Sequence, residues 1–344
     1  MKLFKILSAT LLLLSLLCGC AFFQAEPTAP PPTGDGLTVH YIDVGQADCA
    51  LLECDGEFIL IDGGNVEDSS LVVSYLQKQG VPKLAAVICS HAHEDHVGGL
   101  PGVLAVYPTE AVYAPTRTYS SNCFDDFVYY TDQQGLEITI PKVGDTLSFG
   151  GATAEILGPV QQYADPNNTS LVVKITYGST SFLFTGDMET SAETDLLDSG
   201  ADVKADVLKV GHHGSDTSTG YRFLYEVEPR YAVISVGTGN SYGHPNDVTL
   251  SRLEDADCIT YRTDKLGHII AHSDGTHITF TWENSSTAPD NGSNAEVTYI
   301  GNTKTKKLHL PGCASLPSEQ NQTTFASYDD AIHAGYSPCG NCMG

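Results

Sequence analysis

Residues 90–96 read Ser90-His91-Ala92-His93-Glu94-Asp95-His96, which places three imidazoles and a carboxylate within six positions. Neutral imidazole and carboxylate groups are the usual protein ligands of zinc and similar ions. The apolar residues 84–90 predict a buried strand, and residues 97–106 predict a helix after the motif. On an irregular loop at a strand end, the first two histidines can bind one ion, and the aspartate and last histidine a second. The alternative is a histidine-rich surface loop, which would not need a strand before it and a helix after it.

Further segments carry acids and histidines that fit the same chemistry. They are Ile59-Leu60-Ile61-Asp62-Gly63-Gly64, Phe184-Thr185-Gly186-Asp187, and the later histidines His212, His213 and His244. Together with the His-x-His-x-Asp-His motif, they resemble the metallo-β-lactamase superfamily. The resemblance implies an α/β fold in which two sheets lie between layers of helices, an αββα sandwich. It also implies a site for two divalent metal ions, zinc or manganese.

The resemblance assigns a role to each matching residue. The implied metal ligands are His91, His93, Asp95, His96, Asp187 and His244, with Asp187 bridging the two ions. We prefer His244 as the last ligand because it follows the predicted strand at residues 231–236. One of His212 and His213 would orient a ligand or donate a proton to the leaving group, so Asp95, His212 and His213 are the predicted catalytic residues. Asp62 would orient a metal-bound histidine rather than bind metal.

A narrower resemblance links the chain to the hydrolase domain of ComEC competence proteins. The matching segments are Tyr41-Ile42-Asp43-Val44-Gly45-Gln46-Ala47-Asp48, Val210-Gly211-His212-His213-Gly214-Ser215, Tyr242-Gly243-His244-Pro245 and Tyr261-Arg262-Thr263-Asp264. They occur in the expected order within residues 37–282, which we predict to be the hydrolase domain. The sequence has no counterpart of the multi-pass channel of ComEC proteins, so the resemblance does not imply DNA transport.

The chain departs from the superfamily pattern before Asp187. Many members carry another histidine ligand there, but this chain has no histidine between His96 and His212. The corresponding neighbourhood reads Pro166-Asn167-Asn168-Thr169-Ser170. We expect Asn168 or water to replace the missing ligand. A site richer in oxygen would shift its preference toward manganese or magnesium.

The implied activity is hydrolysis by a metal-activated water. Two cations near Asp187 would lower the pKa of a water molecule to about 7, and the resulting hydroxide would attack phosphorus or a carbonyl carbon. The resemblance favours a phosphodiesterase or nuclease, with extracellular DNA as a candidate substrate. One alternative is a hydrolase of small or cell-wall phosphodiesters. Another is a non-catalytic metal-binding lipoprotein that binds DNA or a cell-surface partner.

The composition limits how an anionic substrate can bind. The 344 residues include 17 Lys and Arg against 42 Asp and Glu, a net charge of −25. This balance argues against a broad basic surface for nucleic acid, so a polyanionic substrate would need the local positive charge of bound metals. The hydrophobic fraction of 41% is enough for a sizeable core and excludes disorder throughout the chain.

Residues 1–20 have the pattern of a bacterial lipoprotein signal peptide. Lys2 and Lys5 precede an apolar run that is short for a membrane span. Cys20 directly follows the small residue Gly19 and is the predicted lipid-attachment site. The Pro-rich residues 21–36 would tether the protein to the extracytoplasmic face of a bacterial cell membrane. The alternative is an ordinary cleaved signal without a lipid.

The C-terminal residues predict a second site. Residues 283–295 are polar and unpatterned, as in a linker, and residues 296–344 form a small separate module. His309, Cys313, Cys339 and Cys342 have the spacing of a structural zinc site, which would stabilise a module too small to rely on its core. The segment resembles the zinc-binding module of Ada-type DNA-repair proteins, with His309 where that module has a cysteine. The alternative is a Cys339–Cys342 disulfide with an unrelated Cys313.

Overall fold

The computed structural model describes residues 36–284, 286–291, 299–309, 313, 315–325, 328–340 and 342. The predicted signal peptide, Cys20 and nearly all of the predicted tether lie outside the described residues. Within the described part, no helix combines the length and the apolar character needed to cross a bilayer.

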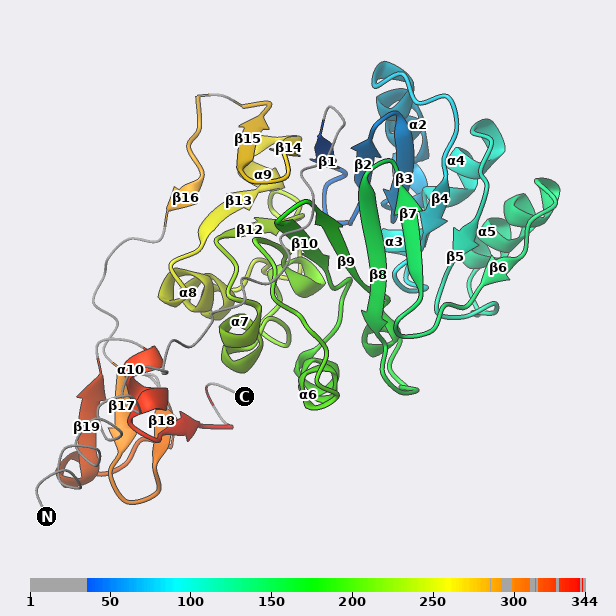
Figure 1. Ribbon diagram of the computed structural model, residues 1–344. Helices are drawn as coiled ribbons and strands as arrows, with labels where there is room; N and C mark the ends of the chain where they lie inside the picture. The colour runs from blue at the N-terminus through cyan, green and yellow to red at the C-terminus, as the bar shows by residue number, and fades with distance from the viewer. Residues whose placement is uncertain are drawn as a thin grey trace, which may run out of the picture. The chain divides into compact units, whose positions relative to one another are not determined.

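A first large sheet is built from both ends of the region that we predicted to be one domain (Figure 1). Its strands follow the order β15-β14-β1-β2-β3-β4-β5-β6. They are β1 (Leu37–Tyr41), β2 (Ala50–Cys54), β3 (Glu57–Ile61), β4 (Ala86–Ile88), β5 (Val112–Tyr113), β6 (Ile138–Thr139), β14 (Ile269–Ser273) and β15 (Ile278–Trp282). Leu37 of β1 pairs with Ser273 of β14 on one side and with Cys54 of β2 on the other. The hairpin of β14 and β15, near the end of the predicted domain, therefore joins the sheet formed by the first strands of the chain.

The second large sheet comes from the middle of the chain, except for its edge strand β16, which lies within the residues predicted to be a linker. Its order is β16-β13-β12-β11-β10-β9-β8-β7. The strands are β7 (Thr146–Phe149), β8 (Ala152–Gly158), β9 (Val172–Tyr177), β10 (Thr180–Phe184), β11 (Val207–Lys209), β12 (Tyr231–Ile234), β13 (Ile259–Arg262) and β16 (Asp290–Asn291). The predicted hairpin around Gly178-Ser179 is the β9–β10 pair, and β10 to β13 run parallel to one another.

Most of the helices connect parallel strands. The helices are α2 (Ser69–Lys78), α3 (Glu94–Val97), α4 (Leu100–Val106), α5 (Asn122–Gln133), α6 (Thr190–Asp198), α7 (Tyr221–Val227), α8 (Asp247–Asp255) and α9 (Thr263–Leu266), with short 3-10 turns η1 (Val66–Asp68), η2 (Asn167–Thr169) and η3 (Gly211–Gly214). Parallel strands need such crossover connections, because a tight turn cannot join them. By contrast, α9 leads from β13 to β14 of the other sheet, and η2 lies between the antiparallel strands β8 and β9.

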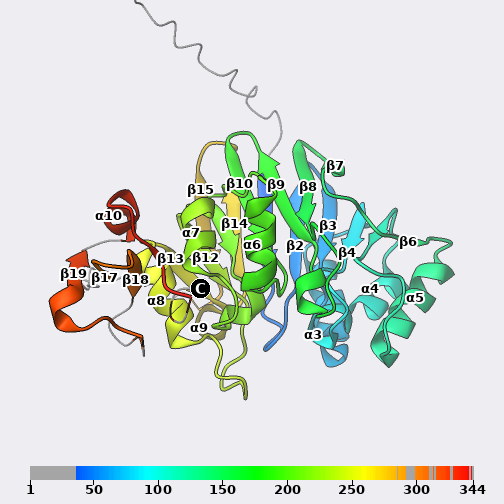
Figure 2. The same cartoon turned by 90° about the horizontal axis from the view of Figure 1, so that it is seen from below.

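The alternation of side chains along the strands explains the layers. Leu52 and Ile59 of the first sheet share a core with Phe182 of the second sheet. Leu51, one residue from Leu52, points to the opposite face and packs with residues of α2, α4 and α5. Leu208 likewise packs with residues of α6, α7 and α8 on the outer face of the second sheet. Two sheets face each other between two helical layers (Figure 2), which confirms the predicted αββα sandwich.

The segment after the histidine motif differs from the prediction. We predicted one helix over residues 97–106, but α3 begins at Glu94 and ends at Val97, and α4 begins at Leu100. Gly98 and Gly99 lie against neighbouring backbone: an added Cβ would stand 2.4 Å from Val66 N at Gly98 and 2.0 Å from Gly63 O at Gly99. The two glycines therefore permit a close approach that brings the loop after β3 onto the histidine motif.

The C-terminal region contains a small sheet of its own, in the order β19-β17-β18-β20. Its elements are β17 (Tyr299–Asn302), β18 (Lys307–His309), η4 (Glu319–Asn321), β19 (Gln322–Phe325), α10 (Tyr328–His333) and β20 (Ser337–Pro338). Two of the predicted zinc ligands follow from this sheet directly: His309 is the last residue of β18, and Cys339 comes immediately after β20.

Candidate metal centre

The predicted site residues lie at the carboxyl ends of parallel strands. Asp62 follows β3, and the motif of residues 90–96 follows β4, which pairs parallel to β3. Asp187 follows β10, and His212 and His213 follow the parallel neighbour β11. Because the carboxyl ends of parallel strands meet at one edge of a sheet, each sheet brings its polar residues to one edge, and ligand sites form there.

Four of these side chains converge on one point. One oxygen or nitrogen atom from each of Asp95, His96, Asp187 and His213 lies within 4.8 Å of the other three. His96 Nε2 is 3.2 Å from Asp187 Oδ1. His213 Nε2 is 3.2 Å from Asp95 Oδ2 and 3.7 Å from Asp187 Oδ2. Asp95 and His96 belong to α3 rather than to an irregular loop, so a rigid helical turn positions them.

The residues of this cluster fit a divalent cation. His96 Nε2 and Asp187 Oδ1 are both buried and, apart from their contact with each other, have no hydrogen-bond partner. A buried polar atom without a partner is costly, and imidazole nitrogen with carboxylate oxygen is a donor set that zinc and manganese accept. The geometry therefore provides a cation site between strands of the two sheets.

The first two histidines of the motif lie beside the cluster. His91 Nε2 is 3.0 Å from His93 Nδ1 and 3.9 Å from Asp187 Oδ2. The structure thus brings His91 and His93 together and turns His91 toward Asp187, but neither histidine belongs to the four-residue cluster. The bridging role of Asp187 stays a prediction.

The later histidines surround the same centre at different depths. His212 Nε2 is 3.7 Å from Asp187 Oδ2, and the His212 ring lies 5.6 Å from that of His244. His213, for which we predicted a catalytic role, supplies an atom of the four-residue cluster, whereas His244 lies beyond His212. Both His212 (φ 49°) and His213 (φ 51°) have left-handed backbone in η3, a strained conformation for non-glycine residues that is typical of functional sites.

Two buried acids support the ligands from behind. Asp62 Oδ2 accepts a hydrogen bond from His96 Nδ1 at 2.9 Å and one from Ser90 Oγ at 2.7 Å. Asp48 Oδ1 is 3.2 Å from His213 Nδ1. Asp62 thus holds the Nδ1 side of His96 and directs its Nε2 toward the centre, whereas His213 Nδ1 lies 3.1 Å from Ser235 O and has Asp48 as a charged neighbour. The role of Asp62 was predicted. The role of Asp48 was not, although Asp48 is the last residue of the segment 41–48 that resembles ComEC proteins.

The electrostatics of the cluster favour added positive charge. Burial alone would lower the pKa of His213, but the carboxylates of Asp187 and Asp48 outweigh burial and raise this pKa to about 10. Burial would raise the pKa of Asp95, but the positive charges of His96 and His213 lower it to about 2. The acids thus favour the protonated form of His213, and a bound cation would replace that proton.

The segment without a histidine contributes differently from the prediction. Asn168 or water was expected to replace the missing ligand. The Oδ1 of Asn168 accepts a hydrogen bond from the backbone N of Glu189 at 3.0 Å, and its Nδ2 is 3.4 Å from Glu189 Oε2. Asn168 therefore holds the segment after Asp187. Its neighbour Asn167 lines the cavity above the cluster and has a buried Oδ1 without a partner.

A cavity of about 930 Å³ opens over the centre. Its lining includes Asp187 and the histidines His93, His212, His213 and His244. Four carboxylates line it, from Glu67, Glu94, Asp95 and Asp187. Among the described residues of the lining, none is Lys or Arg. Lys and Arg therefore supply no positive charge to an anionic substrate inside the cavity, which leaves the histidines of the lining and bound cations to supply it.

The sequence of this region matches a known family. Residues 42–238, more than half of the chain, match the profile described as the Metallo-beta-lactamase superfamily. The chain belongs to this superfamily. Members of the metallo-β-lactamase superfamily are typically metal-dependent hydrolases that bind divalent metals, which agrees with the donor set of the cluster.

Several curated superfamily relatives are competence or recombination proteins, which confirms the narrower resemblance. ComE operon protein 3 of Bacillus subtilis is 31% identical over 67% of this chain and 32% of its own length. Competence protein ComA of Neisseria gonorrhoeae is 30% identical over 72% of this chain and 33% of its own length. Recombination protein 2 of Haemophilus influenzae is 33% identical over 62% of this chain and 26% of its own length. The chain thus spans about a third or less of the length of these relatives.

Solved structures of the superfamily are also similar. The metallo-β-lactamase fold protein YhfI from Bacillus subtilis matches with a TM-score of 0.45 and 14% identity, covering 72% of this chain and 100% of that one.

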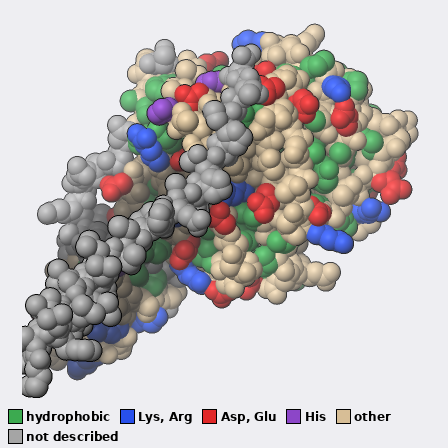
Figure 3. Space-filling view, viewed as in Figure 1, with side chains coloured by type: hydrophobic (Ala, Val, Ile, Leu, Met, Phe, Trp, Pro, Cys, Tyr) green, Lys and Arg blue, Asp and Glu red, His purple; other side chains and the backbone are tan. Residues whose placement is uncertain are grey.

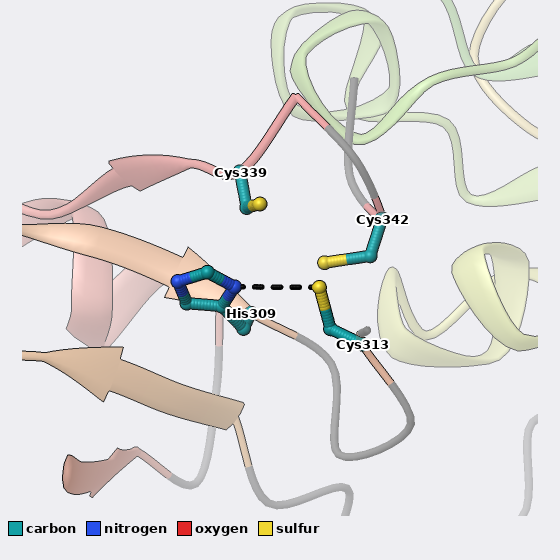
Figure 4. Close-up of side chains that lie close together, drawn as sticks. All are labelled: His309, Cys313, Cys339 and Cys342. Carbon is teal, nitrogen blue, oxygen red and sulfur yellow. Dashed lines mark hydrogen bonds between the residues drawn. The ribbon is translucent and has the colours of Figure 1, made fainter. Parts of the chain in front are cut away.

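A second candidate metal site lies in the C-terminal region (Figure 4). One nitrogen or sulfur atom from each of His309, Cys313, Cys339 and Cys342 lies within 4.8 Å of the others. His309 Nδ1 is 3.4 Å from Cys313 Sγ, while its Nε2 is buried without a partner. The structure therefore brings Cys313 to the Cys339–Cys342 pair rather than leaving it apart.

Proposed function

We propose that this chain is a metal-dependent phosphodiesterase. The observation that carries the proposal is the convergence of Asp95, His96, Asp187 and His213 at the base of a large cavity. The choice of phosphodiesters is supported by the relatives named as competence and recombination proteins, and DNA is the candidate polymer substrate. The lipid anchor at Cys20 would place the activity on the extracytoplasmic face of a bacterial membrane.

In this proposal, the chain's own residues divide the work. Divalent cations bound at the centre would supply Lewis acidity and a water molecule of lowered pKa. His91, His93, Asp95, His96 and Asp187 would hold them, with His213 in place of the predicted ligand His244. The partly exposed His212 has Nδ1 3.3 Å from Thr217 Oγ1 and Nε2 turned to Asp187. His212 Nε2 is therefore placed to give a proton to the leaving oxygen.

Turnover of a simple diester tests the proposal. The full chain, purified in detergent and loaded with Mn²⁺ or Zn²⁺, should hydrolyse bis(p-nitrophenyl) phosphate. Asp187→Asn and His96→Ala should reduce turnover to the uncatalysed level. His277→Ala removes a histidine whose side chain is 82% exposed and serves as the control. A wild-type protein that binds two metals but hydrolyses neither diesters nor DNA would instead favour a binding function.

We further propose that His309, Cys313, Cys339 and Cys342 bind one structural zinc. Four protein ligands leave no open position for a substrate, so this site would stabilise its small sheet rather than catalyse a reaction.

A further inference from the structure

An unusual side chain lies at the rim of the cavity. Tyr242 is 72% exposed, the highest value among the exposed large hydrophobic residues of the described chain. It lines the same cavity as His212 and Asp187, and so does Val66, which is 50% exposed. Single exposed apolar side chains are common, but two at the opening of one polar cavity mark it as a place where an apolar group can bind.

The loop that carries Tyr242 is built around one side chain. Asn240 Oδ1 accepts hydrogen bonds from the backbone N of Tyr242 and of His244, both at 3.1 Å. Asn240 Nδ2 donates to Gly237 O at 3.0 Å and to His244 O at 2.6 Å. The Tyr242 ring lies over His244, with centroids 5.7 Å apart and 25° between the planes. The tyrosine is thus fixed by backbone hydrogen bonds and ring stacking while most of its surface stays open to solvent.

The charges around the cavity limit what kind of diester can bind. Proteins that follow a long nucleic-acid backbone line the path with Lys and Arg. Here Glu67 and Glu94 line the cavity with the acids of the centre, and the described lining contains no Lys or Arg. Figure 3 shows Asp and Glu side chains spread over one face of the larger part, with Lys and Arg side chains between them. Within the cavity, recognition beyond the reacting phosphate therefore has no Lys or Arg to rely on, which favours uncharged contacts such as stacking.

We propose that Tyr242 is a stacking platform for a nucleobase attached to the reacting phosphodiester. The site then takes a nucleoside-bearing diester, such as the end of a single strand or a short oligonucleotide, in preference to a diester without a base. A base can stack on an exposed aromatic ring without any charged contact, which suits an acidic rim. This inference rests on the proposed phosphodiesterase function.

Two diesters with the same leaving group test the platform. The full chain in detergent with Mn²⁺ is assayed on thymidine 5′-(p-nitrophenyl phosphate) and on methyl p-nitrophenyl phosphate. Tyr242→Ala should raise KM for the thymidine ester about tenfold more than for the methyl ester, whereas Tyr242→Phe should retain the wild-type preference. Tyr129→Ala, which removes a 54% exposed tyrosine of α5 outside the cavity lining, is the matched control.

A binding measurement gives a readout without turnover. Thymidine 5′-monophosphate should bind the Mn²⁺-loaded wild type more tightly than methyl phosphate, and calorimetry should show that Tyr242→Ala abolishes this difference. An equal effect of Tyr242→Ala on both esters, or no effect on either, overturns the platform while leaving the phosphodiesterase intact. If the wild type hydrolyses neither ester, the proposed phosphodiesterase function fails. If the wild type binds thymidine 5′-monophosphate and methyl phosphate equally tightly, the stacking platform is overturned whether or not the protein is a phosphodiesterase.

Discussion

Lys209 Nζ lies 2.8 Å from Asp48 Oδ2, and both side chains are almost fully buried. The same carboxylate contacts His213, so the pair joins β11 to the metal centre through an acid that lies before β2. A buried ion pair contributes little net stability compared with an apolar pair, but losing one partner leaves an uncompensated buried charge. Loss of either member of the Lys209–Asp48 pair should therefore affect both the stability of the fold and the metal centre.

Lys209→Met should lower the free energy of unfolding by about 3–5 kcal/mol, because Asp48 would remain buried without its cation. Urea denaturation measures the change. Lys204→Met is the control, because Lys204 and its partner Glu228 are more than half exposed and such pairs contribute about 1 kcal/mol or less. Similar losses in the two variants would contradict the importance of the buried pair.

Asp62→Asn should weaken metal binding more than it weakens folding. Asp62 accepts from His96 Nδ1, which fixes the tautomer that leaves Nε2 available to a cation. Loss of such a supporting carboxylate typically costs about 10–100-fold in metal affinity. Competition with a chromogenic chelator measures the Mn²⁺ or Zn²⁺ dissociation constant. Asp198→Asn, at a carboxylate that is 62% exposed, should leave affinity unchanged, and an unchanged affinity in Asp62→Asn would refute the supporting role.

Cys339→Ser should remove one zinc per chain while the hydrolase centre keeps its metals. Metal content by mass spectrometry after dialysis measures the stoichiometry. Ser315→Ala is the matched control, since Ser315 Oγ lies 3.1 Å from Cys313 Sγ and 3.4 Å from Cys339 Sγ but is not one of the four ligands. If the wild type carries no zinc at this site and its Cys339 and Cys342 thiols react only after reduction, a disulfide is present instead.

Stability should fall as the pH rises from about 4.5 to 7 because of Glu193. Burial raises the pKa of this carboxyl from 4.5 to about 7, although Gly220 N and Thr219 N donate to it. Between these values the folded state binds more protons than the unfolded state, so ionisation opposes folding by at most roughly 3 kcal/mol.

Glu193→Gln isolates this contribution. The amide cannot ionise, so the difference in melting temperature between variant and wild type should change across pH 4.5 to 7 and be constant above it. Other titrating groups are shared by the two proteins and cancel in the difference. A difference that does not vary with pH would show that Glu193 has an ordinary pKa.

The metal-binding chemistry was predictable from local patterns. One short segment after a strand contains His91, His93, Asp95 and His96, and Asp62 and Asp187 each come after an apolar strand. Each of these residues can therefore be recognised without knowing which other ligands it meets in the fold. The αββα layering was predicted from the resemblance to the superfamily, and the structure shows neighbouring strand residues that face different cores. The break at Gly98-Gly99 was missed because it depends on contact with Gly63 and Val66, which the sequence near the helix does not reveal.

Other features depended on the order of strands in space. His213 reaches Asp95 across 118 residues of chain, and Lys209 meets Asp48 from the other sheet, so neither spacing nor composition could rank His213 above His244 or identify the buried pair. Asn168 and Asn167 are adjacent and chemically identical, yet only the backbone of η2 decides which amide holds Glu189 and which lines the cavity. The residue types and their strand-end positions are local properties and can be read along the chain. Their distances from one another arise from how two sheets pack, which is a property of the whole fold.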